Sequence, residues 1–270
     1  MASGLALLAR AALTRKPALV PEGKKVERVE TRVPVSTLDS PKLEPFRRVI
    51  GWRGSELPLT WPHILAADAV LELLTGPRFP VKLLGLVHVA NRIELHAPIG
   101  AHTRGELVVF LEGFKDTERG HEFELHTELH TSEGAVPWRE VTTFLARKKR
   151  SGAKAPSAAA AERPKADRVV EFEAPSGLGR EYGKLAGDLN PIHLSDLSAK
   201  LFGFPRAIAH GMWSLARISA ELKLEAPCVV ECQFKLPVLL PSKLKLELSG
   251  ESFTLIDAAT EKPHVTGSCV

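Results

Sequence analysis

An aspartate, an asparagine and a histidine lie close together in the segment GDLNPIH, as Asp188, Asn190 and His193. Pro191 stands between them, and because proline cannot continue a helix, we predict a bend that follows a helix end. Such a bend can bring a carboxylate and an imidazole to one point, where they hold a water molecule and pass protons to and from it. Asn190 is expected to support the loop or the water by hydrogen bonds. Each residue alone is common in structural turns, so a catalytic interpretation needs a second element nearby.

Such an element is the segment FGFPRAIAHGM, in which Gly211 opens a predicted helix. The first N–H groups of a helix have no intrahelical acceptor and lie at the positive end of the dipole. A glycine there lets a ligand oxygen approach the backbone closely. This arrangement suits a thioester carbonyl that becomes an enolate-like oxyanion.

The elements that must position these residues are a helix and strands. Helical spacing predicts a helix over 210–224, and period-two alternation predicts a strand from Val230 to Leu240, then Pro241-Ser242 as a break and a second strand. The apolar positions of the helix are Met212, Leu215, Ala216, Ser219 and Leu222. Those of the first strand are Val230, Cys232, Phe234, Leu236, Val238 and Leu240.

The N-terminal half repeats this plan, with a helix over 60–75 and then alternating strands, the first with Val87, Val89, Ile93 and Leu95 opposite His88. The apolar positions and the proline of 93–99 match those of 232–238, which indicates an internal duplication. A stretch rich in Lys, Ala, Pro and Ser covers 148–167 and is predicted to be a linker with at most a small helical piece at 158–163. The predicted domains are therefore 1–147 and 168–270.

GDLNPIH followed by GFPRAIAHGM resembles the MaoC-like dehydratases, which include the R-specific enoyl-CoA hydratases. The close match covers about 45 residues, and the strand pattern extends it loosely to the C-terminus. One departure is visible, since Pro205 stands early and Ala207 occupies a position where the family commonly has proline.

The resemblance implies an α+β double hot-dog fold, two repeats of a long helix wrapped by an antiparallel sheet. It implies reversible addition of water to a 2-enoyl thioester, with Asp188 and His193 as the acid–base pair, Asn190 in support and the Gly211 amide as oxyanion hole. Tyr182, His210, Arg206 and Lys235 are candidates for substrate binding. Residues 31–60 contain no histidine, so the N-terminal half is expected to be a degenerate hot dog that makes room for the acyl chain.

The composition argues against two classes of partner. With a net charge of +4 and only 6% aromatic residues, the chain offers no set of aromatic rings on which nucleic-acid bases could stack. No apolar stretch is long enough for a membrane span. Three cysteines, Cys228, Cys232 and Cys269, form no disulfide or zinc pattern, which favours a reducing compartment. We expect a cytoplasmic protein; the basic N-terminus, read as a simple helix, also resembles an organelle transit peptide for the matrix.

No metal and no resident cofactor are expected. Among His121, His126 and His130, the latter two would lie about 13 Å apart along a strand, so we interpret the three as solvated or interface histidines. The expected partners are the acyl thioester of coenzyme A or of an acyl-carrier protein, and a second copy in a homodimer. Two other functions stay open: an acyl-thioester hydrolase of hot-dog type, and a non-catalytic acyl-CoA-binding subunit.

Overall fold

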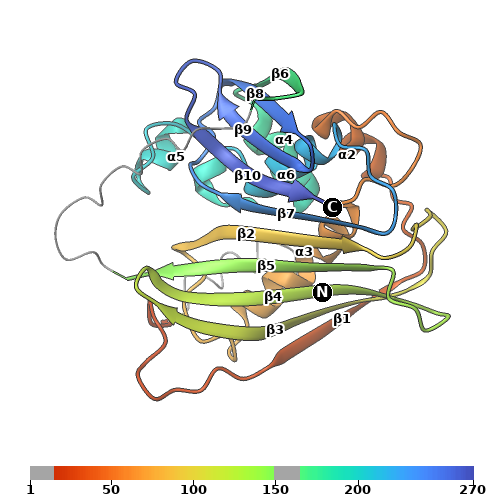
Figure 1. Cartoon of the computed structure of the whole chain (residues 1–270). Coiled ribbons are helices and arrows are strands. Elements are labelled where there is room, and N and C mark those ends of the chain that lie inside the picture. Colours follow the sequence, from red (N-terminus) through yellow and green to blue (C-terminus); the bar gives the residue numbers. More distant parts are fainter. Residues whose placement is uncertain (1–14, 149–164) are drawn as a thin grey trace.

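Alternating apolar side chains build a single antiparallel sheet in the computed structural model, which describes residues 15–148 and 165–270 (Figure 1). The described part of the first half supplies five strands and two helices. In chain order they are β1 (Val29–Val35), α2 (Leu43–Ile50), α3 (Trp61–Thr75), β2 (Leu86–Leu95), β3 (Gly105–Thr117), β4 (Gly120–Thr131) and β5 (Trp138–Arg147).

The second half repeats the order of strand, helices and strands, with extra short helices before its central helix. Its elements are β6 (Arg168–Ala174), α4 (Leu178–Ala186), the 3-10 helix η1 (Pro191–His193), α5 (Asp196–Lys200), α6 (Gly211–Ser219), β7 (Cys228–Phe234), β8 (Ser242–Ser249), β9 (Ser252–Asp257) and β10 (Pro263–Cys269).

The two halves join through their central strands. The sheet order is β1-β3-β4-β5-β2-β7-β10-β9-β8-β6, which reads the same way outward from the β2–β7 seam on both sides (Figure 1). At the seam Asn91 lies opposite Cys232 and Ile93 opposite Val230. Pairing β2 with β7 removes two free sheet edges from the middle of the molecule. The predicted double hot-dog architecture is confirmed, while the boundaries at 147 and 168 remain our prediction.

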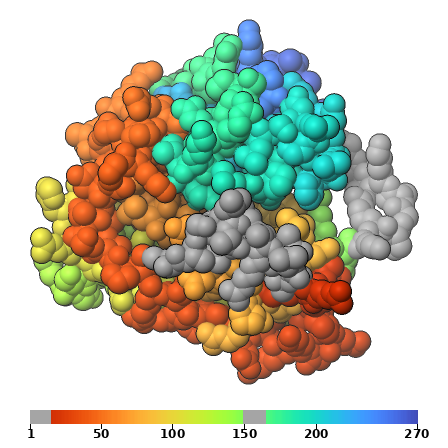
Figure 2. Space-filling model, turned by 180° about the vertical axis from the view of Figure 1, so that it is seen from behind, coloured from red at the N-terminus to blue at the C-terminus, as the bar shows by residue number. Residues whose placement is uncertain are grey.

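The helices cover one face of the sheet. Figure 2 shows from behind that the segment of α2 and α3 lies beside the segment of α4 and α5. Three buried tryptophans hold distant segments of the chain together, because each indole N–H donates to a backbone carbonyl. Trp61 donates to Leu38, Trp138 to Leu59 and Trp213 to Val49. These bonds satisfy the polar atom of a large apolar side chain. One apolar core extends through both halves.

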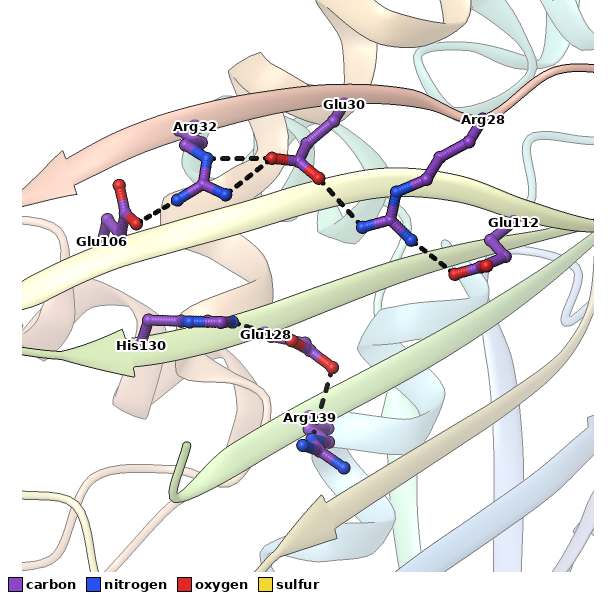
Figure 3. Close-up of polar contacts among 8 residues, drawn as sticks. All are labelled: Arg28, Glu30, Arg32, Glu106, Glu112, Glu128, His130 and Arg139. Atoms are coloured by element: carbon purple, nitrogen blue, oxygen red, sulfur yellow. Dashed lines mark hydrogen bonds and ion pairs between the residues drawn. The ribbon is translucent and has the colours of Figure 1, made fainter. Parts of the chain in front are cut away.

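The opposite face of the N-terminal sheet is polar. Arg28, Glu30 and Arg32 alternate with buried or half-buried residues of β1 and form a row of ion pairs with Glu106 and Glu112 of β3 (Figure 3). A second group joins His130, Glu128 and Arg139. These side chains are largely exposed, so they contribute little to stability individually.

One helix and one strand are shorter in the structure than the periodicity of the sequence predicts. The helix predicted over 210–224 ends at Ser219, and beyond it Arg168 of β6 donates to the carbonyl of Glu221. The strand predicted to run to Leu240 ends at Phe234, and Leu236 is 44% exposed instead of facing the core. Pro237 lacks the N–H that would continue the ladder.

Two histidine placements were wrong. A register shift between His88 and Ala90 turns His88 to the inner face, where its ring meets Phe144 and Phe234. His121 is buried rather than solvated, since its Nδ1 accepts a hydrogen bond from the backbone N–H of Val20 at 2.9 Å.

The predicted N-terminal helix, the piece at 158–163 and most of the predicted linker lie outside the described residues. No helix within 15–148 or 165–270 is both long and apolar enough to cross a bilayer.

Candidate active site

The GDLNPIH segment forms the predicted bend at the end of α4. Gly187 ends the helix in the left-handed conformation, with φ of 69°, which glycine adopts without strain. The Asn190 backbone N–H donates to Asp188 Oδ1 at 3.0 Å, and the Asn190 side chain accepts from the N–H of Ile192 as the cap of η1. Asn190 thus holds the loop, one of the two roles predicted for it.

Two glycines of α4 let this loop pack against the helix. A methyl group on Gly179 would lie 2.0 Å from the carbonyl oxygen of His193, and one on Gly183 would lie 2.6 Å from that of Asp188. The glycines are four residues apart and therefore share one face of the helix. This face sets the distance between helix and loop, and with it the position of both side chains.

Three groups converge at the bend. Asp188 Oδ2 lies 3.9 Å from His193 Nε2 and 3.7 Å from His210 Nε2. The Asp188 side chain is 49% exposed, whereas both histidines are buried. The separations are longer than direct hydrogen bonds, and a water molecule that bonds to both Asp188 and His193 fits such a gap.

Backbone carbonyls fix the tautomers of both histidines. His193 Nδ1 lies 2.7 Å from the carbonyl oxygen of Ile208, so Nδ1–H donates and neutral His193 presents the lone pair of Nε2 to Asp188. His210 Nε2 lies 3.1 Å from the Asp188 carbonyl oxygen, so there Nε2–H donates. The two rings stack with centroids 3.6 Å apart. His193 is therefore arranged to accept a proton, and His210 to hold the backbone of Asp188.

Burial and neighbouring charges set the ionisation of these groups. Burial lowers the pKa of His193, and burial together with the adjacent His193 lowers the pKa of His210 to about 3, so both are neutral at pH 7. Loss of hydration at this packed bend alone would raise the pKa of Asp188, but its interactions with the imidazoles of His210, His193 and His63 and with the N–H of Asn190 outweigh this and lower it. The site therefore combines a carboxylate with a neutral imidazole.

The chain's similarity to known proteins agrees with this geometry. A model of the MaoC like domain matches residues 179–267, which include all three groups. The 3-hydroxyacyl-thioester dehydratase X of Mycobacterium tuberculosis is 33% identical over 275 aligned residues, which cover 98% of this chain and 97% of that protein. The chain belongs to the MaoC-like dehydratase family.

Solved structures extend the comparison to the whole fold. A crystal structure of HtdX from the same organism has a TM-score of 0.73 and 29% identity, with 90% of this chain and 99% of that chain covered. A MaoC-like dehydratase from Phytophthora capsici, at 15% identity, has a TM-score of 0.67 over 90% of this chain and 95% of its own, and it shows the fold alone. The predicted family and fold are confirmed.

The predicted oxyanion donor lies beside the site. Gly211 is the first residue of α6, directly after His210, and an added methyl group would meet the Phe234 ring at 3.2 Å. Tyr182 is buried, with its ring 6.1 Å from that of Phe46 and 5.1 Å from that of His210. Burial, with the negative charges of Glu140 and Asp188, raises the pKa of the Tyr182 hydroxyl, so it remains a proton donor.

The other two predicted substrate-binding residues, Arg206 and Lys235, already have protein partners. The Arg206 guanidinium donates to the Pro241 carbonyl at 3.2 Å, and the Lys235 ammonium donates to Gln233. The unusual Ala207 has a structural consequence, because its backbone N–H donates to Asp196 at 2.9 Å. A proline at this position has no N–H and cannot form this bond.

Asp188, His193 and His210 also offer one ligand atom each within 4.8 Å of one another. Two imidazoles and a carboxylate are a common ligand set for zinc. Both histidines would use Nε2, and His210 already donates from that nitrogen to the Asp188 carbonyl. A metal would therefore require His210 to change its tautomer and lose that bond.

A polar cluster on the inner face of the N-terminal sheet was missed by the sequence analysis. Glu140 of β5 is 1% exposed; its Oε2 lies 2.9 Å from His63 Nδ1, and its Oε1 accepts from Asn91 Nδ2 at 2.8 Å. The sequence does contain one indication of this cluster: in the alternating pattern of β5, Glu140 lies on the same buried face as Trp138. A carboxylate on an otherwise apolar strand face indicates a buried partner.

A separate hollow of about 880 Å³ opens between α2 and α4. Its lining mixes charges, with Arg48, Lys184 and Arg217 facing Glu173 and Glu181. Neither Asp188 nor His193 lines it, so this hollow is distinct from the acid–base groups.

Proposed function

We propose that this protein catalyses reversible hydration of 2-enoyl thioesters to (R)-3-hydroxyacyl thioesters. The observation that carries the proposal is the gap of 3.9 Å between Asp188 Oδ2 and His193 Nε2, with His193 Nδ1 held by the Ile208 carbonyl. A carboxylate and an imidazole lone pair that face each other across this distance suit one bound water molecule.

In the hydration direction, the water oxygen bonds to C3 of the enoyl group while Asp188 and His193 take one of its protons. The electrons of the double bond move to the thioester oxygen, and the backbone N–H of Gly211 stabilises the resulting oxyanion. The proton held by the pair then bonds to C2, as the electrons of the oxyanion re-form the thioester carbonyl. Atoms balance, since one water is added and the pair ends as it began; dehydration takes the same steps in reverse.

His210 has a positioning role in this mechanism. Its Nε2–H holds the Asp188 carbonyl, and its ring supports the His193 ring. Asn190 fixes the carboxylate from the other side through its backbone N–H. These contacts keep both proton-transferring atoms in place without making His210 or Asn190 a proton carrier.

The substrate class is an acyl thioester. The relative in Mycobacterium tuberculosis is named for 3-hydroxyacyl thioesters, which supports the same substrate class here. We propose coenzyme A or an acyl-carrier protein as the carrier, Tyr182 as a wall of the reaction pocket, and the N-terminal half as the place of the acyl chain. Arg206 and Lys235 are the proposed contacts to carrier phosphates, for which each must exchange its present partner.

We also propose a cytoplasmic protein that needs no resident cofactor and that can form a homodimer. The cysteines support a reducing compartment, since Cys228, Cys232 and Cys269 are free thiols. An organelle matrix, suggested by the basic N-terminus, is the alternative location.

The test is hydration of short enoyl-CoA substrates, followed by loss of the conjugated thioester absorbance. The wild type should be active, and Asp188→Asn and His193→Ala should each lose several orders of magnitude in kcat. Undiminished rates in both variants would overturn the assignment. Release of free thiol from acyl-CoA without hydration would instead identify a hydrolase, and tight binding without turnover a non-catalytic subunit.

A further inference from the structure

Three side-chain rings form an aromatic band across the seam between the two halves of the sheet. They are Phe144 of β5, His88 of β2 and Phe234 of β7. The centroid of the His88 ring lies 5.3 Å from that of Phe144 and 4.7 Å from that of Phe234. Because the three strands are consecutive in the sheet (Figure 1), the aromatic band spans two strand spacings, about 10 Å.

The aromatic band is on the face that the helices cover, yet its rings keep exposed surface. Phe234 shares its face of β7 with Val230 and Cys232, which are buried, whereas Phe234 is only half-buried. His88 and Phe144 are half-buried in the same way. Close packing of side chains against an inner face would bury large rings completely. A space that admits solvent therefore lies in front of the aromatic band.

One end of the aromatic band contacts the proposed oxyanion donor. A methyl group added to Gly211 would lie 3.2 Å from the Phe234 ring, so this ring packs against the first residue of α6. Gly211 directly follows His210, which bonds to the Asp188 carbonyl. The Phe234 ring thus lies beside the place where the thioester carbonyl is bound in the proposed mechanism.

The other end of the aromatic band is closed. Phe144 pairs with Phe123 on the next strand, β4. Phe123 is 0% exposed, and its ring packs at 5.4 Å against that of Phe79, which is 1% exposed. A group that lies along the aromatic band can therefore extend from Gly211 as far as Phe144, where the packed core begins.

The surface of the aromatic band is apolar. Its one polar ring, His88, donates from Nε2–H to the Ala90 carbonyl at 3.0 Å. Burial lowers the pKa of His88 to about 4, so the ring is neutral at pH 7. Neutral rings whose polar atoms already have a partner suit a hydrocarbon chain and not the phosphates of a carrier.

We propose that the aromatic band of Phe234, His88 and Phe144 binds the acyl chain and determines which chain lengths the enzyme accepts. The thioester carbonyl lies at the Phe234 end, and the chain points toward Phe144. This inference rests on the proposed function and adds its substrate class. Thioesters of medium length fill the space in front of the aromatic band, whereas longer chains meet Phe123.

Chain-length selectivity tests the proposal, measured as kcat/KM for crotonyl-CoA, octenoyl-CoA and hexadecenoyl-CoA. The wild type should prefer octenoyl-CoA, because the crotonyl group is too short to cover the aromatic band and the hexadecenoyl group is too long. Phe144→Trp fills the closed end and should lower kcat/KM for octenoyl-CoA about tenfold, with crotonyl-CoA within about twofold of the wild type. Phe144→Ala enlarges that end and should raise kcat/KM for hexadecenoyl-CoA about tenfold.

The matched control makes the same two changes at Phe110, which is on the outer face of the neighbouring sheet and stacks on His126. Phe110→Trp and Phe110→Ala should leave the chain-length selectivity unchanged. A wild type that prefers hexadecenoyl-CoA, or unchanged selectivity in both Phe144 variants, would overturn the inference. Phe144→Ala decides alone if Phe144→Trp does not fold.

A binding measurement separates this inference from the proposed function. Octanoyl-CoA is saturated and cannot be hydrated, so calorimetric titration measures its affinity without turnover. Its Kd should be about tenfold higher for Phe144→Trp than for the wild type. A wild type that hydrates none of the three enoyl thioesters would count against the proposed function, and an equal Kd in both proteins would count against the aromatic band as the acyl site.

Discussion

The rings of His193 and His210 stack with centroids 3.6 Å apart and 22° between their planes. Both direct Nε2 toward the same oxygen of Asp188, but only His210 bonds to the backbone of that residue. Protonating one ring would place a positive charge against the other, so the stack favours the neutral form of both. In the proposed mechanism His193 exchanges a proton, while His210 maintains the geometry.

Replacing His210 with phenylalanine separates these roles, because the ring is kept and the donor to the Asp188 carbonyl is lost. We expect kcat to fall about 10- to 100-fold, as for a displacement of reacting groups, with a much smaller change in KM. Steady-state hydration kinetics measure both. The control is His126→Phe on β4, another stacked imidazole, 4.9 Å from the Phe110 ring on the outer face. Equal losses in both variants would contradict a specific role for His210.

The acid–base pair should remain active below the ordinary titration range of histidine. Burial lowers the pKa of His193, and the pKa of Asp188 is lowered as well, so both stay in the proton-accepting form as the pH falls below 6.5. We expect kcat/KM to be level from about pH 6.5 to 8 and to decline only at lower pH, as the pair titrates together. A pH–rate profile from pH 4 to 9 measures this. A decline that begins near pH 7 would contradict it.

The bend that brings the proposed acid–base groups together could be predicted from the sequence because its information is local. Asp188 and His193 are five positions apart, Pro191 forces the bend, and Gly211 lies in a recognisable segment shortly after them. The helix ends and strand ends were less predictable, because the chain beyond α6 makes contacts to distant elements, such as the bond from Arg168 of β6 to the Glu221 carbonyl. Propensity alone does not contain such tertiary contacts.

The His63–Glu140 pair could not be located in this way. Its members are separated by more than seventy positions, and they meet only through the packing of α3 on β5. Asn91 reaches Glu140 because of the register of β2 against β5, where Ile93 lies opposite Glu140. Register depends on turn geometry and on side-chain packing across the whole sheet. A bulge such as the one between His88 and Ala90 changes which face a residue occupies, without a clear local signal.

Adding a methyl group to Gly183 should disturb the active loop more than the fold. The new atom would lie 2.6 Å from the Asp188 carbonyl oxygen, so the loop must shift. For Gly183→Ala we expect at least a tenfold loss of kcat/KM. The control is Gly177→Ala at the start of the same helix, where no atom lies within 4 Å of the added group. Thermal melting and hydration kinetics compare the two, and wild-type activity in Gly183→Ala would refute the close packing.

His88 should make the protein sensitive to acid. Burial, followed by the charge of His63, lowers its pKa to about 4 from an ordinary value of 6.5. Between pH 4 and 6.5 the unfolded state therefore binds more protons than the folded state. The contribution of neutral His88 to the free energy of unfolding, about 3 kcal/mol, is fully present above pH 6.5 and is lost as the pH falls toward 4. His88→Phe should flatten this dependence in urea melts between pH 4 and 7. The control His102→Phe, which changes an exposed side chain, should leave the wild-type slope; an unchanged slope in His88→Phe would contradict the assignment.

Removal of metal ions tests whether Asp188, His193 and His210 serve in proton transfer or as metal ligands. Asp188, His193 and His210 could ligate a cation, but the bond from His210 Nε2 to the Asp188 carbonyl would first have to break. The acid–base mechanism needs no metal, so prolonged treatment with a chelator should leave the hydration rate within about twofold of the untreated enzyme. Added zinc should inhibit rather than activate, because it would compete with the water for His193 Nε2. Loss of activity on chelation and its recovery with zinc would show that the three residues act as ligands and would replace their proposed roles in proton transfer.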